Sequence, residues 1–180
     1  MRLLSPRPLS SSGALGRRQR FLAATPEFSE IVFRVSADSL PILIGTWRLV
    51  SYEAQTSSGE TRYPLGPHVI GQLFYDLHGN MSAHVLRFDR PKFASNDSGA
   101  GTDEEVRAAF EGYTSYFGTY AVDPSARTVT HHVHGASYPN WMGHDQIRYY
   151  RIDASHLVLS TPPILFGGES LKYILTWERI

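Results

Sequence analysis

Three histidines fall within seven residues of the chain, in the segment 128–134. Because side chains alternate between the faces of a β-strand, His132 and His134 would share one face and His131 the other. If that pair faced an interior, its neutral imidazoles could bind a metal ion together with His84 or Asp145. Two other roles for these histidines stay open. They could form hydrogen bonds across the sheet or face solvent, or they could be part of the polar lining of a small-ligand pocket. We predict no metal site, because the third ligand has to be assumed.

The next predicted strand offers polar partners for these histidines. Gln146, Arg148 and Tyr150 share one of its faces under the same alternation. Antiparallel pairing would place His132 opposite Arg148 and His134 opposite Gln146. Such a polar ladder would orient one polar group of a mainly apolar ligand. With residues from two earlier strands, the predicted ligand-binding residues are His84, Tyr116, His132, His134, Arg148 and Tyr150.

Other catalytic patterns do not emerge from the sequence. It contains no nucleophile elbow, phosphate loop, dinucleotide fingerprint or His-Glu-x-x-His helix, so hydride and phosphoryl transfer are not expected. We expect Asp145 in a salt bridge on the outer face rather than as a general base. Trp141 would either plug the core or stack on a ligand. No cofactor is predicted.

Composition excludes several classes of protein. The 180 residues hold 17 Lys+Arg, 17 Asp+Glu and no cysteine. A net charge of +0 gives no field that would attract nucleic acid, and the lack of cysteine excludes disulfides and Cys-based metal sites. No apolar run approaches the roughly 20 residues that span a bilayer. We therefore expect a soluble protein without a nucleic-acid partner; its oligomeric state stays open.

From Leu40 onward, short runs rich in β-branched and aromatic residues alternate with turn residues at intervals typical of antiparallel strands. One long connection contains a helix signal, because Thr102 and Glu105 form a capping box ahead of an apolar stripe. Consecutive antiparallel strands close most economically into a barrel, with the helix covering one end. The predicted class is all-β, an eight-stranded up-and-down barrel with one short helix between strands three and four. The predicted strands span 45–54, 69–76, 80–87, 115–122, 127–136, 144–151, 156–161 and 170–179, and the helix spans 103–112.

Residues 1–39 differ from the remainder of the chain. They hold six Arg against three acids, and no acid precedes Glu27. This Arg-, Ser- and Pro-rich composition resembles a mitochondrial transit segment, although a disordered leader or an early start codon fits equally well. We expect a leader over 1–39, dispensable for folding, and a barrel domain over 40–180. The expected location is cytoplasmic, or the mitochondrial matrix if the leader is a transit segment.

Several motifs resemble the lipocalin-like domain family of bacteria and filamentous fungi. Gly45-Thr46-Trp47 matches the Gly-x-Trp pattern that opens strand one of lipocalins. His134 and His144 depart from the residues usual in the family. The resemblance covers about residues 40–180 and implies a barrel that encloses a small ligand. The other matching segments are 70–73, 79–82, 110–113, 116–120, 131–133, 139–141, 143–148, 159–163 and 175–179.

The matched Gly45 and Trp47 suggest a structural role at the floor of the barrel. Gly45 would let the chain approach closely, and Trp47 would fill the floor. Arg179 from the last strand would cover the indole by cation–π stacking. We assign these three residues to the barrel floor and place the function higher in the barrel.

Two functions from different classes fit these observations. The first is a barrel that binds a small, largely hydrophobic molecule. The second is a cofactor-free isomerase, cyclase or dehydratase that acts on a polyketide or terpenoid intermediate in secondary metabolism, by analogy of fold. Residue patterns do not separate the two.

Overall fold

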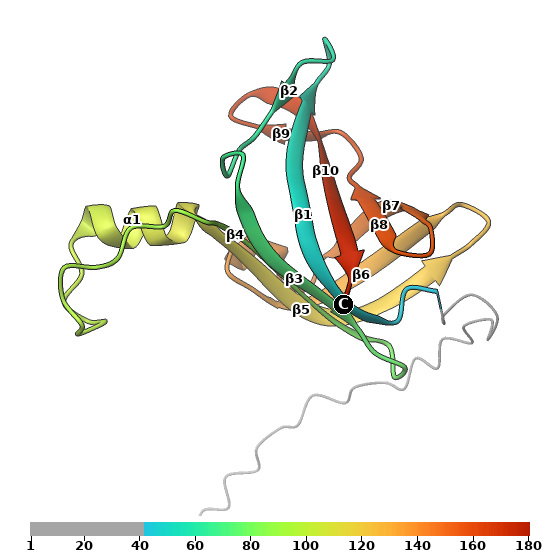
Figure 1. Ribbon diagram of the computed structural model, residues 1–180, viewed down its shortest axis with the longest axis horizontal. Coiled ribbons are helices and arrows are strands. Elements are labelled where there is room, and N and C mark those ends of the chain that lie inside the picture. The colour runs from blue at the N-terminus through green and yellow to red at the C-terminus, as the bar shows by residue number, and fades with distance from the viewer. Residues whose placement is uncertain (1–41) are drawn as a thin grey trace, which may run out of the picture. The chain divides into compact units, whose positions relative to one another are not determined.

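The computed structural model describes residues 42–180 (Figure 1). The predicted leader, 1–39, lies outside the described residues. In chain order the elements are β1 (Gly45–Thr56), β2 (Thr61–Arg62), β3 (Val69–Tyr75), β4 (Asn80–Arg87), α1 (Asp103–Glu111), β5 (Tyr113–Asp123), β6 (Thr128–Ala136), the 3-10 helix η1 (Pro139–Trp141), β7 (Asp145–Ile152), β8 (His156–Ser160), β9 (Ile164–Phe166) and β10 (Glu169–Arg179).

The strands form one closed antiparallel barrel. Their order is β2-β1-β3-β4-β5-β6-β7-β8-β10-β9, and β1 also pairs with β10, which closes the sheet. The eight barrel strands follow chain order, so the predicted eight-stranded up-and-down barrel is confirmed. The short strands β2 and β9 were not predicted. They add to the ends of β1 and β10 through only two and three residue pairs.

Some of the turns between barrel strands are built from local hydrogen bonds to aspartate. Between β3 and β4, the Asp76 carboxylate accepts from the backbone N–H groups of His78 at 2.8 Å and Asn80 at 2.7 Å. Between β5 and β6, Asp123 accepts from the Ser125 N–H at 2.9 Å. Asx turns of this kind reverse the chain within a few residues. Sequential strands therefore become antiparallel neighbours.

Two tryptophans and an arginine occupy one end of the barrel. Trp47 and Trp177 are almost completely buried, and the Trp47 indole N–H donates to the Leu43 carbonyl at 2.9 Å. The Arg179 guanidinium lies 4.1 Å from the centre of the Trp47 ring and donates to two nearby backbone carbonyls. At Gly45 the backbone has φ +135, and a Cβ there would lie 3.0 Å from Arg179. Glycine is therefore required at this position.

The helix α1 lies between β4 and β5 and begins at the capping box that the sequence predicts. The Thr102 side chain accepts from the Glu105 N–H, and the Glu105 carboxylate accepts from the Thr102 N–H. The expectation that the helix covers an end of the barrel is wrong. Figure 1 shows α1 running away from the strands, and no residue of α1 is buried. Its apolar residues remain accessible to solvent, since Val106 and Phe110 are each 52% exposed. Neither described helix has the length and hydropathy of a membrane span.

Candidate functional site

The orientation of β6 decides which histidine faces the interior. His131 is completely buried and packs inward with Val129 and Val133, whereas His132 and His134 point outward. The predicted inward orientation of His132 and His134 is therefore wrong.

The cause is the register between β6 and β7. His131 pairs with Gln146 and Val129 with Arg148, three residues away from the predicted register. The hydrogen bonding between β6 and β7 extends to the end of the connection that contains η1. There the Val133 N–H donates to the His144 carbonyl at 3.2 Å, and the Gly143 N–H donates to the Val133 carbonyl at 2.8 Å. An odd shift in register moves every side chain to the other face.

The outward histidines take part in surface interactions. His132 Nδ1 lies 2.7 Å from Asp145 Oδ1, so Asp145 lies on the outer face in the kind of pair the sequence suggests. His84 also points outward, with its Nδ1 2.7 Å from the Tyr113 hydroxyl. Its predicted place in the interior is wrong as well. Among residues 42–180, no three His, Asp or Glu side chains are grouped to hold a metal ion.

His131 instead links two tyrosines inside the barrel. Its Nε2 lies 2.6 Å from the Tyr75 hydroxyl, and its Nδ1 lies 2.9 Å from the Tyr116 hydroxyl. Burial, and to a lesser extent the positive charge of Arg148, hold the pKa of His131 well below its ordinary value. The imidazole is therefore neutral, with one nitrogen donating to a tyrosine and the other accepting from one. His131 and Tyr75 were missed from the sequence, although the flanking Val129 and Val133 could have indicated the inward face.

Arg148 is the buried cation of the interior. Arg148 is only 9% exposed. Its side chain lies on the inward face of β7, as the sequence predicts. The guanidinium donates to the Ile147 carbonyl at 2.9 Å and to the Gln146 side-chain oxygen at 3.4 Å, both on its own strand. In the described part of the chain, no carboxylate forms an ion pair with it. The charge of Arg148 thus has only neutral acceptors.

Aromatic side chains pack in pairs in the interior of the barrel. Tyr52 stacks on Tyr173, with ring centres 5.5 Å apart, and Trp141 packs edge-on against Tyr116 at 5.7 Å. Burial raises the pKa of Tyr52 far above its ordinary value, and neighbouring Tyr173 adds to the shift, so this phenol stays neutral. Tyr52 packs against both the main core and a smaller core cluster that contains Tyr173. We call the following residues the interior aromatic cluster: Tyr52, Tyr116, Trp141, Tyr150 and Tyr173.

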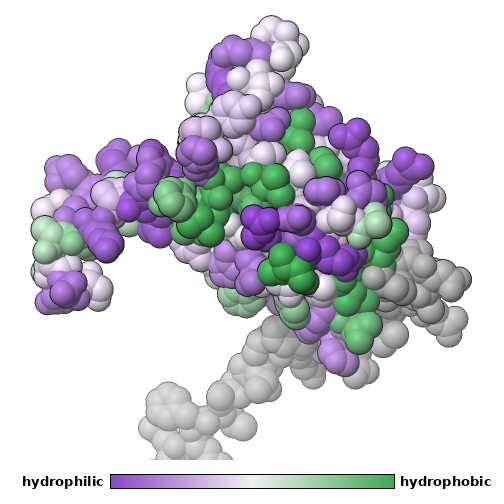
Figure 2. All heavy atoms as spheres, in the orientation of Figure 1, coloured by the Kyte–Doolittle hydropathy of each residue, from purple (hydrophilic) through white to green (hydrophobic). Residues whose placement is uncertain are grey.

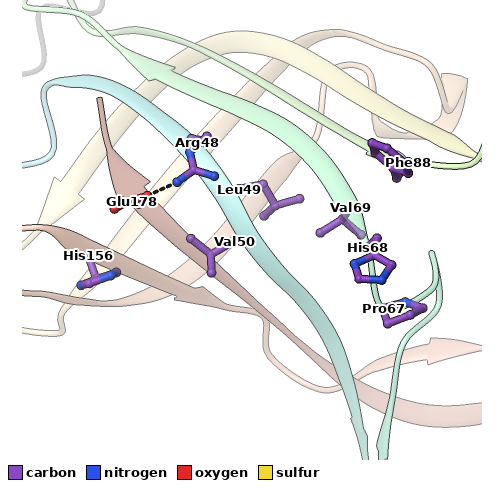
Figure 3. Close-up of a pocket in the computed structure, with 9 residues that line it drawn as sticks. All are labelled: Arg48, Leu49, Val50, Pro67, His68, Val69, Phe88, His156 and Glu178. Atoms are coloured by element: carbon purple, nitrogen blue, oxygen red, sulfur yellow. Dashed lines mark hydrogen bonds and ion pairs between the residues drawn. The ribbon is translucent and has the colours of Figure 1, made fainter.

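A separate groove lies on the outer face of the barrel. β1 pairs with β3 only as far as Arg48 and Gln72, and beyond them the two strands diverge. A groove of about 550 Å³ opens there, with an ion pair between Arg48 and Glu178 (Figure 3). Figure 2 shows hydrophobic residues gathered on this face, between the base of α1 and β1. The groove is lined by Arg48, Leu49, Val50, Pro67, His68, Val69, Phe88, His156 and Glu178.

Comparison with known proteins places the barrel in a family. A family model described as a lipocalin-like domain matches residues 44–180. The chain belongs to the lipocalin-like domain family. The resemblance seen in the sequence motifs is therefore confirmed.

Two individual proteins are similar to this lipocalin-like chain. One is the 4'-hydroxy-3'-methoxypropiophenone carrier protein ppsC of Aspergillus oryzae, which is 36% identical over 107 residues, covering 56% of this chain and 96% of the relative. The other is a solved polyisoprenoid binding domain from Saccharophagus degradans, implicated in plant cell wall breakdown. It is 10% identical, with a TM-score of 0.29, over 75% of this chain and 94% of the other.

Proposed function

We propose that this lipocalin-like barrel binds a small, largely hydrophobic aromatic molecule in its interior and acts as its carrier. The observation that carries the proposal is the interior aromatic cluster, which shares the barrel interior with the buried cation Arg148. Tyr52, Gln146 and Tyr150 face inward yet remain partly exposed, which supports access of a small molecule to the interior beside them. A relative named as a carrier of an aromatic ketone adds support.

Each part of the proposed site would contribute a different interaction. Ring faces such as those of Tyr52 and Trp141 favour a flat apolar ligand, and an aromatic pair adds roughly 0.5–1.5 kcal/mol beyond area burial. Arg148 would orient the polar end of the ligand. Of the six ligand-binding residues expected from the sequence, Tyr116, Arg148 and Tyr150 remain in this proposal.

Adjacent tyrosines on β7 provide a matched test. Tyr150 faces inward, whereas Tyr149 is 49% exposed on the outer face. Titration of the protein with 4'-hydroxy-3'-methoxypropiophenone, followed by calorimetry, should show saturable binding. Tyr150→Ala should weaken binding about tenfold or more, equivalent to about 1.4 kcal/mol. Tyr149→Ala should leave binding unchanged. Absence of binding to the wild-type protein, or equal loss in both variants, would contradict the proposal.

The cofactor-free enzyme remains a second candidate, favoured by the hydrogen bond between His131 and Tyr116. A neutral imidazole bonded to a phenol can move a proton when the phenol touches a substrate. Tyr116 belongs both to this pair and to the interior aromatic cluster. An isomerase, cyclase or dehydratase acting on a polyketide or terpenoid intermediate would use such a pair.

Proton exchange next to a ketone tests this second function. In D₂O, NMR would follow loss of the CH₂ protons beside the carbonyl of 4'-hydroxy-3'-methoxypropiophenone. Catalysis predicts that wild-type protein accelerates the exchange and that His131→Gln does not. Exchange at the buffer rate with bound ketone would argue against proton transfer to this compound and favour carriage alone.

A further inference from the structure

We infer that the barrel holds its ligand as an anion, a phenolate or an equally acidic enolate, with the negative oxygen on the guanidinium of Arg148. This inference rests on the proposed function and adds the chemical class and charge state of the ligand. It starts from a buried cation that lacks a counter-ion within the described residues.

The guanidinium of Arg148 has more donors than its neighbours use. It carries five N–H groups in a planar fork suited to an oxyanion. The two hydrogen bonds that it makes both go to neutral acceptors on its own strand, at Ile147 and Gln146. A buried charge without an opposite charge is costly, and proteins usually pair it. The remaining donors are thus available to a ligand.

Within residues 42–180, no side chain facing Arg148 supplies the missing negative charge. Tyr52 on β1 and Tyr75 on β3 lie within its electrostatic reach, but burial raises the pKa of both phenols well above the ordinary value. His131 on β6 is neutral or positive at any pH, never negative. Gln146, beside Arg148 on β7, has no charge to give. The ligand is therefore the group that can neutralise Arg148.

A phenol that carries an acyl group in the para position suits this site. Its anion spreads charge from the phenol oxygen to the ketone, so it ionises more readily than tyrosine, whose phenol ionises near pH 10. A guanidinium contact inside the barrel favours the anion further. The ring of such a ligand would lie against the interior aromatic cluster while its oxygen meets Arg148.

Two probes that differ by one methyl group separate charge from shape. The first is 4'-hydroxy-3'-methoxypropiophenone, and the second is 3',4'-dimethoxypropiophenone, which has no phenol to ionise. Ultraviolet difference spectra report the phenolate, because its absorption lies at longer wavelength than that of the phenol. Spectra would be taken about one pH unit below the pKa of the free first probe, and affinities of both probes measured by calorimetry.

The matched variants are Arg148→Met, which removes the inward cation, and Arg151→Met, which removes an exposed arginine from the same strand. Wild type and Arg151→Met should bind the phenol at least tenfold more tightly than the ether and should show the phenolate band. Arg148→Met should lose the band and bind the two probes equally. Arg148→Gln provides a second neutral variant if the Met variant does not fold.

Two results would overturn the inference, and they differ from failure of the proposed function. Wild-type protein that binds both probes with equal affinity and shows no phenolate band holds a neutral ligand, which leaves the carrier proposal intact. If the phenolate band persists in folded Arg148→Met or Arg148→Gln, a residue other than Arg148 stabilises the anion. If wild-type protein binds neither probe, the proposed function itself fails, and the inference fails with it.

Discussion

The Tyr75 hydroxyl and the His131 imidazole lie 2.6 Å apart inside the barrel, and both side chains are completely inaccessible to solvent. Removal of the hydroxyl in Tyr75→Phe leaves His131 Nε2 without this partner in an apolar site. A buried polar atom that loses its partner costs about 1–3 kcal/mol. We expect the free energy of unfolding, measured with urea, to fall by that amount. The exposed Tyr63→Phe serves as control and should change it by less than about 0.5 kcal/mol. Equal stability of the two variants would contradict the importance of this hydrogen bond.

Acid should destabilise the fold through His131. Its folded pKa is depressed by burial and by Arg148, so the imidazole stays neutral between Tyr75 and Tyr116 while the unfolded chain binds a proton near pH 6.5. This contribution to stability is complete above pH 6.5 and is lost as pH falls from there toward the folded pKa. Between pH 7 and pH 5 the loss for one histidine is at most about 2 kcal/mol.

Urea unfolding at pH 7 and pH 5 measures this pH dependence. His131→Gln should reduce the stability difference between the two pH values, by up to about 2 kcal/mol, because glutamine does not titrate. The exposed His134→Gln should keep the wild-type difference. An unchanged pH dependence in His131→Gln would show that other groups cause the acid sensitivity.

Outward histidines should not affect ligand binding. His132 pairs with Asp145 on the outer face, and His134 is exposed. We expect His132→Ala and His134→Ala to bind 4'-hydroxy-3'-methoxypropiophenone with a Kd within twofold of wild type. Calorimetric titration of each variant checks this. A tenfold loss in His132→Ala, with the melting temperature unchanged, would favour the site expected from the sequence over the interior one.

Gly118 marks the closest backbone approach between β5 and β6. A Cβ at this position would lie 1.9 Å from the His132 carbonyl oxygen, where the register of the two strands shifts. Gly118→Ala must therefore move a strand, and overpacking of this kind costs about 1–3 kcal/mol or more. The melting temperature should fall by several degrees. Gly99→Ala, where a Cβ meets only ordinary contacts, should melt like wild type. Equal melting of both variants would contradict this packing.

Much of the fold can be predicted from the sequence because its signals are local. Turn residues such as Asp76 and Asp123 separate the strands, and the capping box at Thr102 marks the start of α1. The inward face of β7 is also predicted, because Gln146, Arg148 and Tyr150 alternate with outward residues.

Which side chains face the interior depends on how the strands pair across the barrel. Local sequence signals do not determine this pairing. The register of β6 against β7 follows from η1 and the bonds of Gly143 and His144 to Val133, and a shift of three residues exchanged His132 for His131. Likewise, a bulge between Leu49 and Ser51 in β1 lets Tyr52 face inward. Half of the predicted site residues, namely His84, His132 and His134, lie on the outer face.

The position of the ligand is the most direct test of the proposed interior site. Protein with ¹⁵N-labelled arginine would be titrated with 4'-hydroxy-3'-methoxypropiophenone, and the side-chain Nε–Hε signals followed by NMR. Arg148→Met and Arg48→Met assign the two relevant signals by their disappearance. The Arg148 signal should shift in step with occupancy while the Arg48 signal, from the outer groove of Figure 3, stays unchanged. A shift of Arg48 with Arg148 unchanged would place the ligand in the outer groove and contradict binding inside the barrel.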